Sequence, residues 1–141
     1  MRISLLSWLA LVGLILGLSS CFSSRNKQSA YTVAFYNVEN LFDTVDDPNK
    51  IDEDFLPSSE KEWNSTKYSK KIDDLARVIY SIDSVKLPVL VGLCEIENNL
   101  VVSDLAQNKR LKSADYQVVW SEGPDVRSID CALMFDSTRF R

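Results

Sequence analysis

The sequence predicts a mixed α/β fold, and three observations carry that prediction. Short runs rich in β-branched, aromatic or aliphatic residues have the length of strands. A longer stretch in the middle of the chain repeats apolar residues at helical spacing. Segments of the two kinds alternate along the chain, which is typical of α/β architectures. The 141 residues, 45% hydrophobic and 26% charged, are ordinary for a globular protein with one domain.

The N-terminus predicts an export signal. Arg2 precedes an apolar run over residues 3–18, which is shorter than the roughly 20 residues that a membrane-spanning helix needs. The run ends at Leu18-Ser19-Ser20-Cys21, which resembles a bacterial lipobox and implies that Cys21 becomes the lipid-modified first residue. The alternative is an uncleaved anchor helix with an incidental cysteine. We therefore expect a signal peptide over residues 1–20, a tether over 21–30 and a protein exported and lipid-anchored to the bacterial cell envelope, with the membrane as a partner.

The first folded segments are predicted to be a strand, a long loop and a helix. Residues 31–36 are aromatic or β-branched and predict a strand that ends at polar residues 37–40. Residues 43–62 are acidic, contain two prolines and show no period, so we expect a loop. Asn64 or Ser65 can cap a helix whose apolar positions step by four and three residues. These positions are Tyr68, Ile72, Leu75, Ile79 and Ile82.

The remaining segments are predicted to be a strand, a helix and two further strands. Residues 89–94 are nearly all apolar and too few for a helix, which predicts a strand covered on both faces. We expect a second helix over residues 100–111. Residues 116–120 and 129–135 read as strands joined by a turn at Glu122-Gly123-Pro124-Asp125.

Two cysteines fall inside expected strands. Cys94 and Cys131 have apolar neighbours, and cysteine in such a setting commonly serves as a small hydrophobe. We therefore expect both to be buried. A disulfide is the alternative, which export would permit, although one pair of cysteines does not establish it from sequence.

Composition excludes several kinds of chemistry. The chain has no histidine, which rules out a Ser-His-Asp triad, a Cys-His pair and a His-ligated zinc site within it. Its formal net charge of −4 gives no general basic surface. Binding to nucleic acid would therefore depend on a local patch or a metal ion.

Carboxylates follow two of the expected strands directly. Glu39 stands just after the first strand, and Glu95 and Glu97 follow the second. Ligands of α/β sheets bind beyond the carboxyl ends of strands. Alternation along a continuing strand would place Glu95 and Glu97 on one face and turn Ile96 into the core. A hard cation such as Mg²⁺ would offset the cost of gathering these charges. The alternative is a pair of solvated acids near the N-terminus of the next helix.

Three motifs together resemble a known family. FYNVENLFD, GLCEIEN and GPDVRSIDCALMF occur in this order at residues 35–43, 92–98 and 123–135. In order and spacing they resemble the first half of the endonuclease/exonuclease/phosphatase superfamily, the fold of DNase I and the abasic-site endonucleases. The resemblance covers roughly residues 31–140. It implies the N-terminal portion of a DNase I-like four-layer α/β/β/α sandwich.

The resemblance also assigns roles to four residues. It implies that Glu95 is the principal Mg²⁺ ligand, with Mn²⁺ as an alternative metal, and that Glu39 is a second acid near the metal. Asn37 falls on the asparagine that holds the active-site network in place. Arg127 matches an arginine that contacts the substrate phosphate, a task that suits its forked donors.

Two features complicate the arginine assignment. A surface ion pair of Arg127 with Asp125 or Asp130 is the alternative role. Ser128 stands where the family pattern usually has glycine, so the backbone would differ here if the glycine was needed for a positive φ.

The activity implied by the resemblance is metal-dependent hydrolysis of a phosphate ester by a phosphodiesterase, nuclease or phosphatase. DNA, RNA, phosphoinositide and sphingomyelin remain open as substrates, and no protein partner follows from the sequence. The family's Asp-x-Asn motif and histidines belong to a second half that residues 31–141 do not include. We therefore expect an incomplete domain that is inactive by itself. The alternative is a non-catalytic exported remnant or binding lipoprotein on the same framework.

Overall fold

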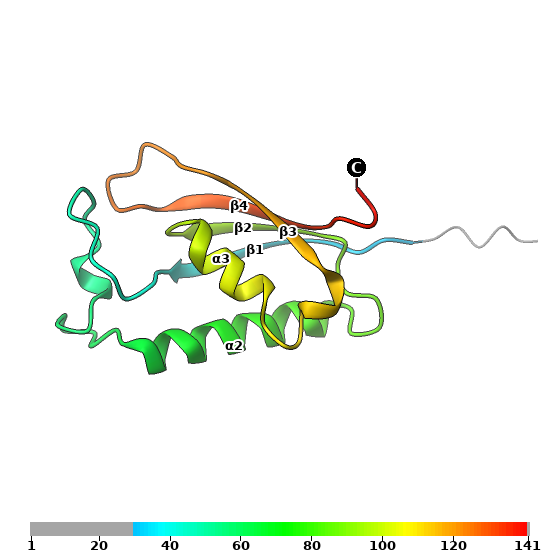
Figure 1. The fold of residues 1–141 in the computed structure, drawn as a ribbon, viewed down its shortest axis with the longest axis horizontal. Helices are drawn as coiled ribbons and strands as arrows, with labels where there is room; N and C mark the ends of the chain where they lie inside the picture. The colour runs from blue at the N-terminus through cyan, green and yellow to red at the C-terminus, as the bar shows by residue number, and fades with distance from the viewer. Residues whose placement is uncertain (1–29, 141) are drawn as a thin grey trace, which may run out of the picture. The chain divides into compact units, whose positions relative to one another are not determined.

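A four-stranded mixed sheet with two helices on one face forms the fold (Figure 1). The computed structural model describes residues 30–140, so the predicted signal peptide, most of the tether and Cys21 lie outside the described residues. The elements in chain order are β1 (Val33–Leu41), the 3₁₀ turn η2 (Glu53–Phe55), α2 (Ser65–Ile82), β2 (Leu90–Ile96), α3 (Asn99–Ala106), the 3₁₀ turn η3 (Lys112–Ala114), β3 (Tyr116–Ser121) and β4 (Asp130–Asp136). This order confirms the predicted α/β fold class.

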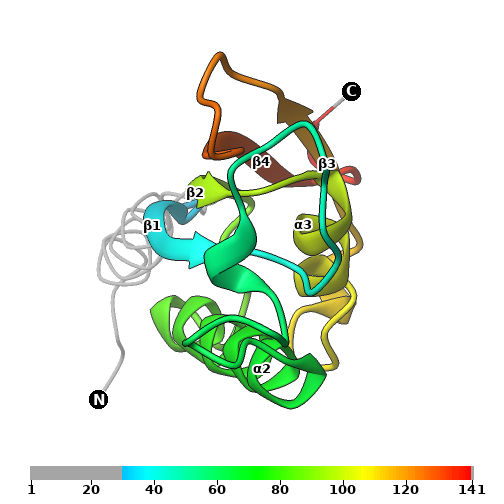
Figure 2. The ribbon, with the colours of Figure 1, turned by 90° about the vertical axis from the view of Figure 1, so that its left-hand side faces the viewer.

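The sheet has the strand order β1-β2-β4-β3. β1 and β2 are parallel and are connected through α2, whereas β4 runs antiparallel to both of its neighbours. Because β1 and β2 are parallel, their carboxyl ends lie at the same edge of the sheet, next to the loop that leads into β4 (Figures 1 and 2). The predicted site residues are at this edge.

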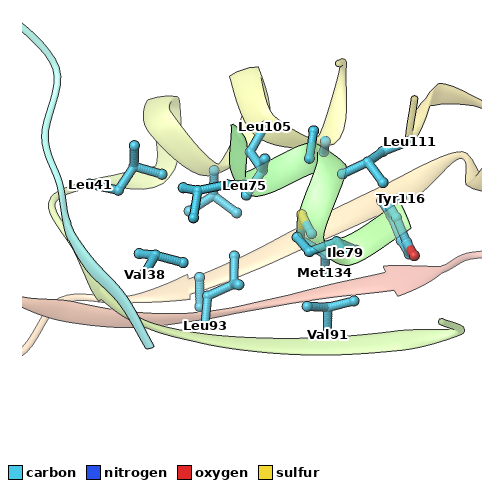
Figure 3. Close-up of a cluster of buried hydrophobic side chains, with 14 of the residues drawn as sticks. Val38, Leu41, Leu75, Ile79, Val91, Leu93, Leu105, Leu111, Tyr116 and Met134 are labelled. Carbon is cyan, nitrogen blue, oxygen red and sulfur yellow. The ribbon is translucent and has the colours of Figure 1, made fainter. Parts of the chain in front are cut away.

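The core lies between the sheet and the helices (Figure 3). Alternate residues of the strands point toward α2 and α3 and are buried, as expected from the pleat of a strand. α2 begins as predicted, because the Asn64 side chain accepts hydrogen bonds from the backbone N–H groups of Thr66 and Lys67. The main core side chains are Val38, Leu41, Leu75, Ile79, Val91, Leu93, Leu105, Leu111 and Met134.

The opposite face of the sheet, which we call the open face, is covered by no helix or strand of residues 30–140 (Figure 2). Phe35 on β1 is 76% exposed, and Val33 and Val119 are also exposed. The prediction that residues 89–94 are covered on both faces is therefore wrong for the described part of the chain. Phe35 packs against Gly92, where an added Cβ would lie 2.8 Å from its ring.

Two predicted boundaries differ from the structure. β1 continues through the polar residues to Leu41, with an irregular register after Asn37. The second helix ends at Ala106 instead of residue 111. Beyond it the Asn108 side chain accepts the Arg110 N–H, a local bond that competes with helix propagation.

The predicted loop over residues 43–62 is ordered by aromatic contacts. The rings of Phe42 and Phe55 stack with centroids 4.1 Å apart, and Trp63 meets Phe55 edge-on. The loop also reaches the segment between β3 and β4, where the Ile51 N–H donates to the Val126 carbonyl at 2.8 Å. These contacts hold the loop beside the sheet edge that carries the candidate site.

No helix in residues 30–140 combines the length and hydropathy that crossing a bilayer would require.

Candidate active site

The ends of β1 and β2 bring Asn37 and Glu95 into contact. Asn37 is the register partner of Cys94 in the parallel pair. Its amide Nδ2 donates to Glu95 Oε1 at 2.7 Å, and its Oδ1 accepts the Glu39 N–H at 2.8 Å. The amide therefore connects the two strand ends and fixes the orientation of the Glu95 carboxylate.

A backbone irregularity places Glu95 on the open face. Cys94 pairs with Cys131 and Ile96 pairs with Asp130, so Glu95 is an extra residue between two successive pairs. Its φ of 62° is in the left-handed region, which costs a non-glycine residue about 1 kcal/mol. The bulge leaves Glu95 partly exposed and returns Ile96 to the core.

Glu97 is separated from Glu95, so the prediction that they share a face is wrong. The prediction assumed that the strand continues, whereas β2 ends at Ile96 and the Glu97 carboxylate turns toward the backbone of Asp43. Glu97 is 5% exposed, and its Oε2 accepts the Asp43 N–H at 2.7 Å. The pKa of Glu97 is raised to about 7, chiefly by burial and also by the nearby charges of Asp43 and Asp52, against the lowering effect of the Asp43 N–H bond. Glu97 thus binds the backbone just after β1 and does not lie on the open face.

The structure positions Glu39 through its backbone. Its φ is 54°, its N–H binds Asn37, and its carbonyl accepts a hydrogen bond from Lys71 on α2 at 3.0 Å. Glu39 and Lys71 line a pocket of about 290 Å³ beside α2. No hydrogen bond within residues 30–140 joins the Glu39 carboxylate to Glu95 or Asn37.

The donor set at Glu95 fits a magnesium ion that retains most of its water. Asn37 binds Oε1, and within the described chain Glu95 Oε2 has no hydrogen-bond donor. Mg²⁺ commonly takes one or two carboxylates and keeps several waters. A closed protein cage is not formed, since no three Asp, Glu or Cys side chains of residues 30–140 gather closely enough to enclose a metal.

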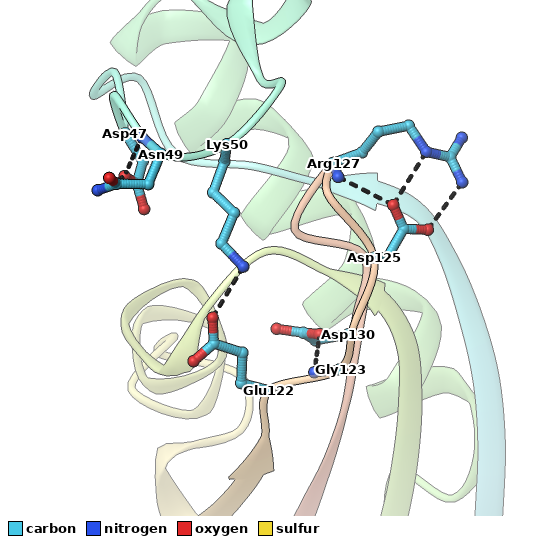
Figure 4. A network of polar contacts seen from close by, with 8 residues as sticks. All are labelled: Asp47, Asn49, Lys50, Glu122, Gly123, Asp125, Arg127 and Asp130. Atoms are coloured by element: carbon cyan, nitrogen blue, oxygen red, sulfur yellow. Dashed lines mark hydrogen bonds and ion pairs between the residues drawn. The ribbon is translucent and has the colours of Figure 1, made fainter.

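Arg127 lies on the loop before β4 and is bound to Asp125 (Figure 4). Its Nη2 is 2.9 Å from Asp125 Oδ2, and its Nε donates to Oδ1 at 3.2 Å. The hydrogen bonds and charge of Asp125 raise the pKa of Arg127, and the charge of Glu95 adds to this effect. The pair is exposed, so its net stabilisation is small.

A pocket of about 360 Å³ adjoins Arg127. Its wall combines the loop over residues 43–62, which we call the aromatic loop, with the loop over residues 122–129, which we call the arginine loop. It therefore offers apolar, basic and acidic side chains at the sheet edge. It is lined by Asn40, Phe42, Ile51, Glu53, Asp54, Phe55, Lys61, Arg127 and Ile129.

Ser128 adopts the backbone conformation that a glycine would favour. Its φ is 58°, and its N–H donates to the Asp125 carbonyl at 3.0 Å. The departure from the family pattern therefore leaves a left-handed residue at this position.

Several contacts of the site were not predictable from the sequence. Asp130 is buried, and its Oδ1 accepts the Gly123 N–H at 2.6 Å instead of binding Arg127 (Figure 4). Lys50 Nζ lies 2.8 Å from Glu122 Oε1 and so connects the aromatic loop to the segment after β3. Lys50 and Glu122 are distant in sequence, and no local pattern indicates either this pairing or the bond between Gly123 and Asp130.

The fold and the site define an α/β protein with a polar site where two parallel strands end. Residues 32–141 match the sequence profile of the Endonuclease/Exonuclease/phosphatase family, so the chain belongs to that family of hydrolases and nucleases. No curated protein and no solved structure matches the chain significantly.

Proposed function

We propose that the protein is a Mg²⁺-dependent hydrolase of phosphate esters, acting as a phosphodiesterase, nuclease or phosphatase. The observation that carries the proposal is the contact between Asn37 and Glu95 at the carboxyl ends of β1 and β2. It leaves a partly exposed carboxylate in a fixed orientation at the place where α/β sheets bind ligands. Membership of the family supports the reaction class.

Each residue has a definite task in this proposal. Glu95 would hold Mg²⁺, or Mn²⁺ in its place, and Glu39 would be a secondary acid near the metal. When bound, the metal would stabilise charge on phosphate oxygens and lower the pKa of a bound water. Asn37 keeps the Glu95 carboxylate from rotating.

Arg127 is the proposed phosphate contact. Its guanidinium already makes a forked bond to one carboxylate, and a phosphate presents the same bidentate geometry. Exchange of Asp125 for substrate would bring the phosphate beside the pocket that Arg127 lines. DNA, RNA and phospholipid headgroups all carry such a phosphate, and we propose no choice among them.

We further propose that the protein is exported and held at the bacterial cell envelope by lipid on Cys21. The support is the short apolar run and the Leu18-Ser19-Ser20-Cys21 sequence. This location would place phosphate esters outside the cytoplasm, or at the membrane surface, within reach of the site.

The metal site is tested by calorimetric titration of Mg²⁺ and Mn²⁺ into the wild type, Glu95→Gln and Glu60→Gln. Glu60 is an exposed glutamate of the aromatic loop and serves as the matched control. We expect Glu95→Gln to weaken binding at least tenfold and Glu60→Gln to leave it unchanged. Equal binding by all three proteins would mean that Glu95 is a solvated acid and does not bind the metal.

Turnover separates the hydrolase from a binding protein. The chain has no histidine, and a missing general base costs on the order of 10²–10⁴-fold in rate. We therefore expect little hydrolysis of bis(p-nitrophenyl) phosphate by this chain, and Mg²⁺-dependent hydrolysis by a chimaera in which a family member supplies the histidines and the Asp-x-Asn motif. Metal binding without turnover in the chimaera would favour the non-catalytic alternative.

A further inference from the structure

Cys94 and Cys131 lie directly opposite each other in the antiparallel pair of β2 and β4. The Asp136 N–H donates to the Val89 carbonyl at 3.0 Å, so the pair that these two residues form is hydrogen-bonded. Hydrogen-bonded and non-hydrogen-bonded pairs alternate along an antiparallel ladder. Counting along the register from Val89 to Cys94 therefore makes Cys94 and Cys131 a non-hydrogen-bonded pair.

This kind of pair fits the dimensions of a disulfide. Residues of a non-hydrogen-bonded pair have Cα atoms about 4.5 Å apart and Cβ atoms within about 4.5–5.5 Å. A disulfide requires a Cα separation of about 4.4–6.8 Å and a Cβ separation of about 3.5–4.5 Å. The two thiols can therefore bond with a small approach of the strands.

Both side chains point to the open face of the sheet. Cys131 is exposed and Cys94 is half-buried, and neither is bonded in this structure. The prediction that both cysteines are buried is therefore wrong, because the face on which they lie has no cover among residues 30–140. An oxidant in solution would reach Cys131 directly.

The pair lies next to the candidate active site. Cys94 is the register partner of Asn37 on its other side and immediately precedes Glu95. Cys94 and Cys131 also form the last residue pair of β2 and β4 before the bulge at Glu95. A disulfide between Cys94 and Cys131 would link β2 to β4 at their last regular residue pair, next to the Glu95 carboxylate.

We propose that Cys94 and Cys131 form a redox-active pair that closes an inter-strand disulfide at the edge of the active site. The inference goes beyond the proposed hydrolase function and does not depend on it, since it rests on strand register and exposure. Its effect would be to hold the start of β4, and the arginine loop that precedes it, against the end of β2.

The chemistry is thiol–disulfide exchange with a low-molecular-weight disulfide such as oxidised glutathione. The Cys131 thiolate attacks one glutathione sulfur, forms a mixed disulfide and releases one glutathione thiolate. The Cys94 thiolate then attacks the Cys131 sulfur, forms the inter-strand bond and releases the second glutathione thiolate. The two protein thiols are oxidised, one glutathione disulfide is reduced to two thiols, and the protons lost by the cysteines end on glutathione.

The test uses the full chain with Cys21→Ser, which leaves only the two strand cysteines. The protein is equilibrated in glutathione buffers of increasing oxidised fraction, quenched with acid, alkylated and mapped by peptide mass spectrometry. We expect a linked peptide joining Cys94 to Cys131 within a monomer, and a higher melting temperature in the oxidised than in the reduced protein. The shift should vanish in Cys94→Ala and in Cys131→Ala.

Three results would overturn the proposal. One is full alkylation of both cysteines in the most oxidising buffer while circular dichroism shows the protein folded. Another is separate glutathione adducts on Cys94 and Cys131 without the linked peptide. The third is a disulfide-linked dimer through Cys131 as the main oxidised species on a non-reducing gel.

Discussion

Four residues at or near the candidate site have left-handed backbone conformations without being glycine. They are Glu39, Asn40, Glu95 and Ser128. Such conformations store strain, and the surrounding structure has to hold them in place. Here the Asn37 amide, Lys71 and the Asp125 carbonyl bind the residues involved or the residues next to them. The strained positions lie where the two parallel strands end and where the arginine loop turns back toward β4.

Replacing Ser128 with glycine should relieve part of this strain. Glycine adopts positive φ freely, so we expect Ser128→Gly to raise the free energy of unfolding by about 0.5–1 kcal/mol. Urea denaturation followed by circular dichroism measures the change. Ser121→Gly, at an extended position of β3, should lower stability instead. A loss of stability in both variants would contradict the strain assigned to Ser128.

Glu97 should make stability depend on pH between about pH 4.5 and 7. Its pKa in the folded protein, about 7, is above the ordinary value of 4.5 because the carboxyl is buried. The stabilising contribution of its protonated form is complete below about pH 4.5 and is lost as the pH rises through 7. The shift corresponds to roughly 3 kcal/mol.

The variant Glu97→Gln should keep the bond to the Asp43 N–H and remove this pH dependence. We expect it to be more stable than the wild type at pH 8 and similar at pH 4.5, in thermal melts recorded with a chelator. Glu60→Gln, which changes an exposed carboxylate, is the control. Parallel stability curves for the wild type and Glu97→Gln would mean that folding leaves the pKa of Glu97 unchanged.

Lipid attachment at Cys21 remains a prediction. Cells that produce the protein and are fed a fatty-acid analogue should label the wild type and leave Cys21→Ser unlabelled. Cys131→Ser is the matched control, because it removes an exposed cysteine of the folded domain. Equal labelling of wild type and Cys21→Ser would remove the support for a lipid anchor.

The sequence could predict the positions of those site residues that lie directly at the end of a strand. The sequence placed Asn37 and Glu95 at the ends of two strands, and the structure makes these strands parallel neighbours and brings the Asn37 amide to 2.7 Å from the Glu95 carboxylate. Glu97 was misplaced because β2 ends at Ile96 and the Glu97 carboxylate binds the backbone of Asp43, a partner that no local pattern indicates. The roles assigned to Glu39 and Arg127 stay predictions, since a metal and a phosphate would rearrange their present partners.

At the scale of elements, α2 was predictable because a capping residue and a regular apolar period coincide. α3 was predicted too long, since residues 107–111 keep a buried leucine at helical spacing although Asn108 bends the chain into a turn. The strands were located correctly, but their ends were not. Polar residues within β1 and the bulge in β2 depend on neighbouring strands for their hydrogen bonds.

The cap of α2 should contribute measurably to stability. Asn64→Ala removes the oxygen that accepts the Thr66 and Lys67 N–H groups, and such a loss costs about 1 kcal/mol. Ser65→Ala, one residue inside the helix, is the control and should change stability by less than half as much. Chemical denaturation of both variants gives the comparison. Equal losses would show that the Asn64 side chain does not act as the cap.

At the scale of the whole molecule, the open face determines how the described domain meets its surroundings. Exposed apolar residues are scattered over most proteins, but here Val33, Phe35 and Val119 share one face of a sheet. Phe35 and Val119 are the two ends of one row across the sheet, with Gly92 and Leu133 between them, and exposed apolar residues on one face favour association. We expect the protein to self-associate at micromolar concentrations unless another segment or partner covers this face.

Phe35→Thr should reduce that association. The substitution removes the most exposed aromatic ring of the open face and retains a residue suited to a strand. Sedimentation velocity over a concentration series measures the effect. Val85→Thr, which changes an exposed valine in the turn after α2, should leave association unchanged. If both variants associate as the wild type does, the open face is not the contact surface.

The parallel pairing of β1 with β2 also has a kinetic consequence. It joins Val33 to Leu90 across all of α2 and the aromatic loop, whereas β3 and β4 are joined by one short connection. Because closing a longer loop costs more chain entropy before any contact forms, the hairpin of β3 and β4 should appear first during refolding. The edge where Asn37 meets Glu95 is then the last part of the sheet to acquire its native geometry, and the amide protons of β1 should be the slowest to gain protection from exchange.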